Sequence, residues 1–276
     1  MHFLVKFFSF LSLLFMGNAA PFEHDLHLFS IPGTNCRTMI CFHGYGANYK
    51  IAEDLKNLGL IDATLVSFNF PDHDLLEKTY DPRQATFGTI RELFPAFYVL
   101  KKYVIDQDLN AIDLYGFSAG GAVAINLIAV LNTTTHDIAL KQMGIGTKEK
   151  EKLLSAIQNG VVILDVPLKS VEEILDLRGP SPELEILAKN YRENHFRPID
   201  ALESLNGLCL DIILHFQEPD EIIFNRDDHI YIERLKKANS KGATSVIIGN
   251  DGGHIAPHLA LWQFYSQKIK KNKEDL

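Results

Sequence analysis

Ser118 stands in the sequence Gly-Phe-Ser-Ala-Gly at residues 116–120, between a predicted strand at 111–115 and a predicted helix at 119–131. A serine at a sharp strand-to-helix turn projects its hydroxyl above a sheet, and glycines two residues to either side let neighbouring backbone pass close by. The start of the helix also directs free N–H groups toward the place where negative charge would develop. We therefore predict that Ser118 is a nucleophile for acyl transfer; a structural turn serine is the alternative.

A general base for that serine is expected late in the chain. His254 follows the strand predicted over 244–248 and a loop rich in glycine. The glycines before it let the backbone turn back toward Ser118, and an imidazole can take the hydroxyl proton and return it to a leaving group. We expect His254 to be this base, with His258 and His229 as weaker candidates.

The carboxylate that orients the base is expected between the serine and the histidine, in the chain order Ser, acid, His. The strand predicted over 208–216 runs into a turn with three acidic residues, Glu218, Asp220 and Glu221. Asp220 is our choice, because its distance ahead of His254 leaves room for one helix and one strand. Glu218 and Asp165, at the end of the preceding predicted strand, remain alternatives, since acidic turn residues are often only solvated.

A second junction between a strand and a glycine-rich loop lies upstream. Residues 38–42 predict a strand that runs into His-Gly-Tyr-Gly at 43–46, and a helix is predicted over 48–58. Backbone N–H groups exposed in this loop are placed to join that of Ala119 around an oxyanion. His43 precedes the nucleophile, which is the wrong order for the base, so we expect it to buttress the loop through hydrogen bonds.

These residues need a scaffold, and the rest of the sequence predicts one. Short apolar runs bounded by turn residues alternate with longer runs of helical periodicity, which is typical of βαβ units around a mostly parallel, buried sheet. The remaining strands are expected over 26–31, 64–70 and 160–165, and the remaining helices over 89–105, 229–238 and 257–271.

The alternation is interrupted over about residues 169–206, a polar and helix-prone stretch longer than an ordinary connection between a strand and a helix. We expect a small helical cap here, inserted into a single domain that spans 20–276. A surface excursion with no role in substrate binding is the alternative.

The composition is that of an ordinary globular protein, with 46% hydrophobic and 22% charged residues. The formal net charge of −8 comes from acidic residues spread along the chain, which argues against a nucleic-acid partner. Neighbouring His and Asp residues occur at 24–25, 72–74 and 227–229, but without the spacing of a recognised metal motif. We therefore expect no metal and no organic cofactor.

Residues 1–19 have the pattern of a signal peptide. Lys6 precedes an apolar run at 7–16 that is too short to span a bilayer, and small residues suit cleavage after Ala19. We therefore expect an exported protein, secreted or periplasmic, without a membrane span once the leader is removed. An uncleaved anchor or a buried first element is the alternative.

Three cysteines are an odd number for an exported chain, so at least one is expected to stay free. Cys41 and Cys209 lie in apolar, strand-like runs and are expected in the core. The sequence leaves open whether Cys36 is paired.

Taken together, the loop at 43–46, the serine motif at 116–120, the carboxylate of Asp220 and Gly-Gly-His at 252–254 resemble the α/β-hydrolase superfamily in its esterase- and lipase-like branch. The resemblance covers about residues 26–267. It implies a central, mostly parallel sheet flanked by helices.

The resemblance also implies an activity and two further site residues. The backbone amides of Tyr45 and Ala119 become the oxyanion donors, and Ser118, His254 and Asp220 become a triad that cleaves a carboxylic ester, or a related acyl bond, of a small molecule. A serine peptidase of the prolyl-peptidase type and a catalytically silent binding protein on the same scaffold are the alternatives. In one departure from the family pattern, Asp74 stands where a glycine is common after the fourth strand.

Cleavage of the leader is directly testable. Protein exported by the native host should begin at Ala20, because the apolar run matches a leader better than a spanning helix. Intact-mass spectrometry measures the N-terminus, and protein taken from inside the same cells is the control that should retain some leader. Exported protein that still begins at Met1 would contradict the prediction.

Overall fold

The computed structural model describes residues 26, 28–70, 88–194, 196–222, 228–250, 253–255 and 258–274. The predicted leader at 1–19 and the loop around Asp74 lie outside the described residues.

A single sheet runs through the described part of the chain. Its order is β1-β3-β2-β4-β5-β6-β7, and all neighbours are parallel except β1, which runs antiparallel to β3. The central, mostly parallel sheet predicted from the sequence is therefore confirmed. The strands are β1 (Leu28–Ile31), β2 (Thr38–Phe42), β3 (Thr64–Phe68), β4 (Asp113–Phe117), β5 (Val162–Asp165), β6 (Asp211–Gln217) and β7 (Ala243–Gly249).

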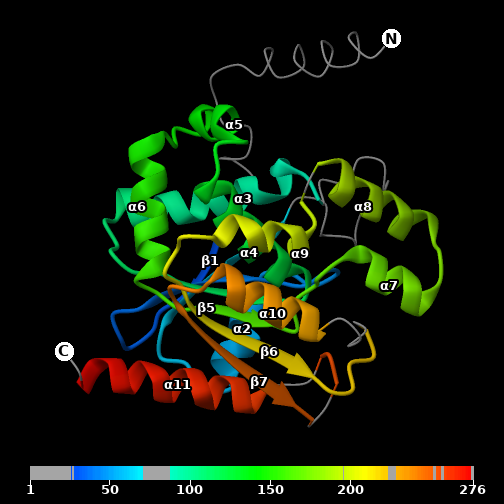
Figure 1. Cartoon of the computed structure of the whole chain (residues 1–276). Helices are drawn as coiled ribbons and strands as arrows, with labels where there is room; N and C mark the ends of the chain where they lie inside the picture. The colour runs from blue at the N-terminus through cyan, green and yellow to red at the C-terminus, as the bar shows by residue number, and fades with distance from the viewer. Residues whose placement is uncertain are drawn as a thin grey trace.

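Helices cover both faces of this sheet (Figure 1). One buried apolar cluster joins the sheet to α3, α4, α6 and α10, and a second joins it to α2 and α11. The flanking helices are α2 (Ile51–Asn57), α3 (Ile90–Lys101), α4 (Ala119–Asn132), α5 (Asp137–Gln142), α6 (Thr147–Gln158), α10 (Asp228–Ala238) and α11 (Leu259–Glu274). Because both faces are covered, the central strands read as continuous apolar runs, as β2 does in Thr-Met-Ile-Cys-Phe.

Two features of the helical layer were not predicted. The helix expected over 89–105 is α3 continued by a π-helical turn at Lys102–Asp106, and α5 and α6 fall where no helix was expected. In α6 the apolar stripe is thin, and even Lys150 is buried, so its periodicity is weak in the sequence. Its start is instead marked by Glu149, whose carboxylate accepts a hydrogen bond from the Gly146 N–H at 3.0 Å.

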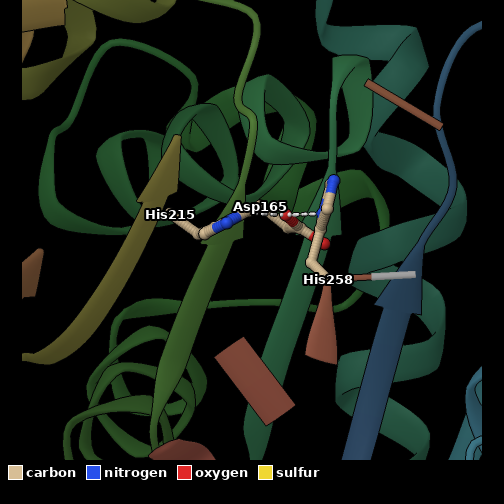
Figure 2. A group of neighbouring side chains, drawn as sticks. All are labelled: Asp165, His215 and His258. Carbon is tan, nitrogen blue, oxygen red and sulfur yellow. Dashed lines mark hydrogen bonds and ion pairs between the residues drawn. The ribbon is translucent and has the colours of Figure 1, made fainter. Parts of the chain in front are cut away.

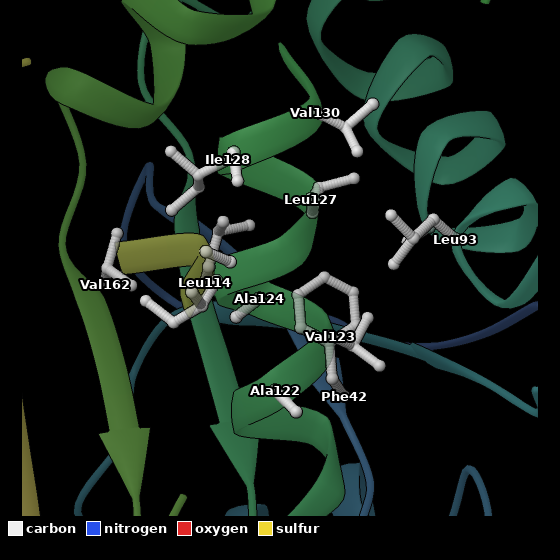
Figure 3. Close-up of a cluster of buried hydrophobic side chains, with 14 of the residues drawn as sticks. Phe42, Leu93, Leu114, Ala122, Val123, Ala124, Leu127, Ile128, Val130 and Val162 are labelled. Atoms are coloured by element: carbon white, nitrogen blue, oxygen red, sulfur yellow. The ribbon is translucent and has the colours of Figure 1, made fainter. Parts of the chain in front are cut away.

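Helix α4 carries the predicted nucleophile at its start and is buried along nearly its whole length. Figure 3 shows it enclosed by Leu114 and Val162 of the sheet on one side and Leu93 of α3 on another. A helix that is apolar all round belongs in a protein core. The body of α4 is therefore packed all round, which fixes the position of Ser118 at its start.

The stretch predicted as a cap forms helices between β5 and β6. They are α7 (Val171–Arg178), α8 (Pro182–Glu193), α9 (Pro198–Ala201) and a 3-10 turn (Leu202–Leu205). The turn and α9 pack on α4, whereas α7 and α8 pack on each other and project from the side toward which β6 and β7 run (Figure 1).

The prediction for the cysteines was partly wrong. Cys41 is buried in β2, but Cys209 is exposed, and both Cys36 and Cys209 are free thiols. Cys209 precedes β6 by two residues, and at this sheet entry its N–H bonds to Gln158 at 3.0 Å.

Among the helices described, none is both long enough and apolar enough to cross a membrane.

Gly120 sets how closely α4 approaches the end of β2. A Cβ at this position would lie 2.1 Å from the Phe42 carbonyl oxygen, which is backbone and cannot move aside freely. We expect Gly120→Ala to lower the free energy of unfolding by about 1–3 kcal/mol, measured by urea denaturation.

Gly146→Ala is the matched control, because its Cβ would meet only the flexible Glu149 side chain, at 2.9 Å. Loss of a glycine cap there should change stability by less than about 1 kcal/mol. Equal stability losses in the two variants would show that the contact with Phe42 does not limit the approach of α4.

Candidate active site

The backbone at Ser118 is strained and held in place. Its φ of 53° and ψ of −116° lie outside the regions that non-glycine residues ordinarily adopt. Its N–H donates to the Asp165 carbonyl at 2.9 Å, and its own carbonyl accepts from Gly121 at 2.9 Å and Leu168 at 3.0 Å. Such a conformation persists only where the surroundings over-determine it. The sharp turn predicted between the strand and the helix is thus present.

The loop after β2 lies beside this serine. A Cβ built on Gly44 would be 3.3 Å from the Ser118 Cβ, so the glycine allows a close approach. His43 is fully buried, donates from Nδ1 to the Gly44 carbonyl at 2.9 Å and accepts at Nε2 from the Phe70 N–H at 3.4 Å. His43 is therefore a neutral buttress of the loop, the role that the sequence favoured.

The two predicted oxyanion donors lie in the loop after β2 and at the start of α4. Tyr45 is 45% exposed in the loop after β2, and Ala119 is the buried first residue of α4. The first N–H groups of a helix have no carbonyl one turn earlier to bond, and the helix dipole makes this end positive. An anion beside Ser118 would meet that end of α4.

His254 and Asp220 are brought together from positions 34 residues apart. His254 Nδ1 and Asp220 Oδ2 are 2.7 Å apart, and the two side chains are only 3% and 4% exposed. The other oxygen of Asp220 accepts the Ile222 N–H at 2.8 Å, which fixes the carboxylate. A carboxylate at Nδ1 holds the ring proton there and leaves Nε2 as the basic nitrogen.

Glu221 contacts the backbone of His254, which the sequence did not predict. Its Oε2 accepts the backbone N–H of His254 at 2.9 Å, and Gly253, with φ of 76°, packs directly against its carboxylate. The alternative acid Glu218 is exposed, as is the alternative base His229.

Asp165, the other alternative acid, belongs to a separate buried cluster (Figure 2). Its Oδ1 lies 2.8 Å from His215 Nδ1 and 2.7 Å from His258 Nδ1, and Oδ2 accepts from the Tyr115 hydroxyl at 2.8 Å. Burial alone would raise the pKa of the Asp165 carboxyl, but the hydrogen bonds from the two histidines hold it below its ordinary value. Asp165 is therefore an ionised carboxylate beneath the site.

Asp165, His215 and His258 are all residue types that can bind a metal ion. One potential ligand atom from each lies within 4.8 Å of the other two. Sequence reasoning missed this cluster, although one signal was present: Asp165 and His215 are direct partners in the register of β5 and β6. A pocket of about 660 Å³ adjoins it, with Phe117, Asp165 and His258 in its wall beside residues of α2 and Trp262. Neither Ser118 nor His254 lines this pocket.

The chain resembles solved structures of esterases. An esterase from Pyrococcus furiosus superposes with a TM-score of 0.56 at 15% identity, covering 89% of this chain and 85% of the other. A lipase-esterase related protein from Clostridium acetobutylicum gives 0.53 at 15% identity, covering 89% and 98%. An inhibited esterase B from Lactobacillus rhamnosis gives 0.58 at 12% identity, covering 99% and 96%.

No protein-family model and no curated protein matches the sequence. At sequence identities of 12–15%, the structural likeness shows which fold the chain has. The chain has the α/β-hydrolase fold, as the sequence resemblance implied.

Proposed function

We propose that the protein is a serine hydrolase that cleaves a carboxylic ester, with Ser118 as nucleophile, His254 as general base and Asp220 as the orienting acid. The observation that carries this proposal is the buried hydrogen bond between His254 and Asp220 at 2.7 Å. The strained turn at Ser118, and a fold shared with solved esterases, support it.

Acylation follows from the direction of these hydrogen bonds. Because Asp220 keeps a proton on Nδ1 of His254, Nε2 takes the Ser118 hydroxyl proton as Oγ attacks the ester carbonyl carbon. The amides of Tyr45 and Ala119 stabilise the resulting oxyanion, aided by the dipole of α4. Collapse breaks the bond to the alcohol oxygen, and His254 returns its proton to that oxygen.

Deacylation repeats the same steps with water. His254 takes a proton from the water as its oxygen attacks the acyl carbon, and then returns a proton to Ser118 Oγ as the acid leaves. Each group in this cycle is a side chain or a backbone amide of this chain.

We place small acyl esters first among the substrates. One neighbouring structure is described as a tributyrin phosphonate complex of esterase B from Lactobacillus rhamnosis, and it covers 99% of this chain with a TM-score of 0.55. The helices α7 and α8, on the side toward which β6 and β7 run, form the element we assign to substrate range.

Covalent labelling tests the nucleophile. A fluorophosphonate probe should label the wild-type protein on Ser118, because this serine stands at the strained turn between β4 and α4. Ser118→Ala should abolish labelling and ester turnover, and exposed Ser240 offers a control, Ser240→Ala, that should change neither. Labelling that persists in Ser118→Ala would contradict the assignment.

The same purified protein separates the rival classes. Turnover of a panel of acyl esters with little turnover of peptide amides supports an ester hydrolase, and the reverse selectivity would indicate a peptidase. A folded wild-type chain that neither reacts with the probe nor turns over any substrate would indicate a silent binding protein.

Amide substitution tests the acid. Asp220→Asn should keep the geometry but favour the wrong imidazole tautomer of His254, which lowers kcat by about 10⁴-fold in the Ser-His-Asp template. Glu218→Gln is the matched control on an exposed side chain of the same turn and should leave kcat within about twofold. Steady-state kinetics measure both, with circular dichroism to confirm folding. A large loss at Glu218 with little at Asp220 would overturn the assignment.

A further inference from the structure

His258 joins the buried cluster around Asp165 to the loop that carries His254. Its Nδ1 is 2.7 Å from the Asp165 carboxylate, and its Nε2 is 3.2 Å from the carbonyl oxygen of Gly253. The ring is 3% exposed, so each nitrogen must satisfy its hydrogen bond within the protein.

Both partners of His258 are acceptors. A backbone carbonyl cannot donate, and Asp165 is ionised and accepts from every neighbour. His258 must therefore carry a proton on both nitrogens, which makes it an imidazolium paired with the Asp165 carboxylate. His215 contacts the same carboxylate through Nδ1 at 2.8 Å.

Several described groups face the His258 ring from the elements packed around it. His215 lies against it with ring centroids 4.4 Å apart, and the Tyr115 hydroxyl is bonded to Asp165. The ring of Phe117 contacts both His258 and His254. Burial raises the pKa of Tyr115 well above its ordinary value, so it stays neutral. Lys50 and Asp54 line the adjoining pocket with His258.

The distances in the cluster favour a proton over a metal ion between these groups. The two Nδ1–Oδ1 separations, 2.8 and 2.7 Å, match N–H···O hydrogen bonds. Two ligands of a tetrahedral ion with bonds of about 2.0–2.1 Å would instead stand about 3.3 Å apart. The geometry thus describes donors to a carboxylate and not the ligands of an ion.

The decisive feature is that one peptide group is held at both ends. The carbonyl of Gly253 and the N–H of His254 belong to the same peptide plane, and His258 binds the first while Glu221 binds the second at 2.9 Å. Hydrogen bonds to charged partners are about twice as strong as neutral ones. The orientation of this plane sets where the His254 side chain begins.

We propose that Asp165 and His258 are positioning residues for His254: the charged His258 holds the peptide plane before His254, and Asp165 holds the charge of His258. This inference rests on the proposed role of His254 as the general base. Asp165 also accepts the Ser118 N–H through its own carbonyl at 2.9 Å. One residue therefore ties the backbone of the nucleophile to the backbone of the base.

A matched pair of variants separates the two hydrogen bonds of His258. In His258→Asn the amide nitrogen replaces Nδ1 and keeps the donor to Asp165 but loses the bond to Gly253. In His258→Gln the amide nitrogen replaces Nε2 and keeps the bond to Gly253. His215→Asn touches the same carboxylate without touching the loop and serves as the control.

We expect His258→Asn to lower kcat for a small ester by about 10- to 100-fold with KM within about threefold, because a displacement of about 1 Å has that effect on a reacting group. His258→Gln should recover most of this loss, and His215→Asn should stay within about threefold of wild type. Rates are normalised to active sites titrated with the fluorophosphonate probe, so that unfolded protein does not count.

The charge state is measured on the wild-type protein, independently of any variant's folding. Long-range ¹H–¹⁵N spectra at neutral pH should show His258 protonated on both nitrogens. A neutral His258, stoichiometric metal in the purified protein, or an unchanged kcat in His258→Asn would each overturn the positioning role. Absence of Ser118-dependent turnover in the wild type would overturn the proposed function itself, and the positioning role with it.

Discussion

Asp165 is bonded through its backbone and its side chain at once, and the geometry of the site depends on both. Its carbonyl accepts the N–H of Ser118, and its carboxylate accepts from His215, His258 and Tyr115. An ionised carboxylate without partners could not be buried at this depth. The three donors make its burial possible, and the buried carboxylate in turn stabilises the positive charge proposed for His258. Sheet, turn and loop are joined at this residue.

Much of the fold could be predicted because its physical causes are local. Buried parallel strands must be apolar on both faces, so β2 and β5 are visible as continuous apolar runs. The glycines around Ser118 mark a sharp turn, because Gly120 lets α4 approach the end of β2 and Gly116 lets β4 approach the start of α4. The pairing of Asp220 with His254 was suggested by chain order alone, and the two side chains do lie in contact.

What the sequence concealed depends on contacts between distant elements. Asp165 meets His215 only through the register of β5 and β6, and its contact with His258 joins residues 93 positions apart in the sequence. Glu221 was not singled out from the sequence, because its bond to the His254 N–H has no local signature. The prediction that Cys209 lies in the core was wrong for a local reason. Its apolar neighbours in the sequence belong to the segment leading into β6, where Cys209 itself is exposed.

The left-handed backbone at Ser118 has a consequence for how this chain responds to selection. A φ of 53° costs an ordinary L-residue on the order of 1–3 kcal/mol, and a glycine at this position would relieve that strain. A screen that ranks variants by melting temperature would therefore reward Ser118→Gly. Thermal resistance and the retention of a hydroxyl at this turn are opposed at a single position, so libraries intended to make the protein more robust should keep residue 118 fixed.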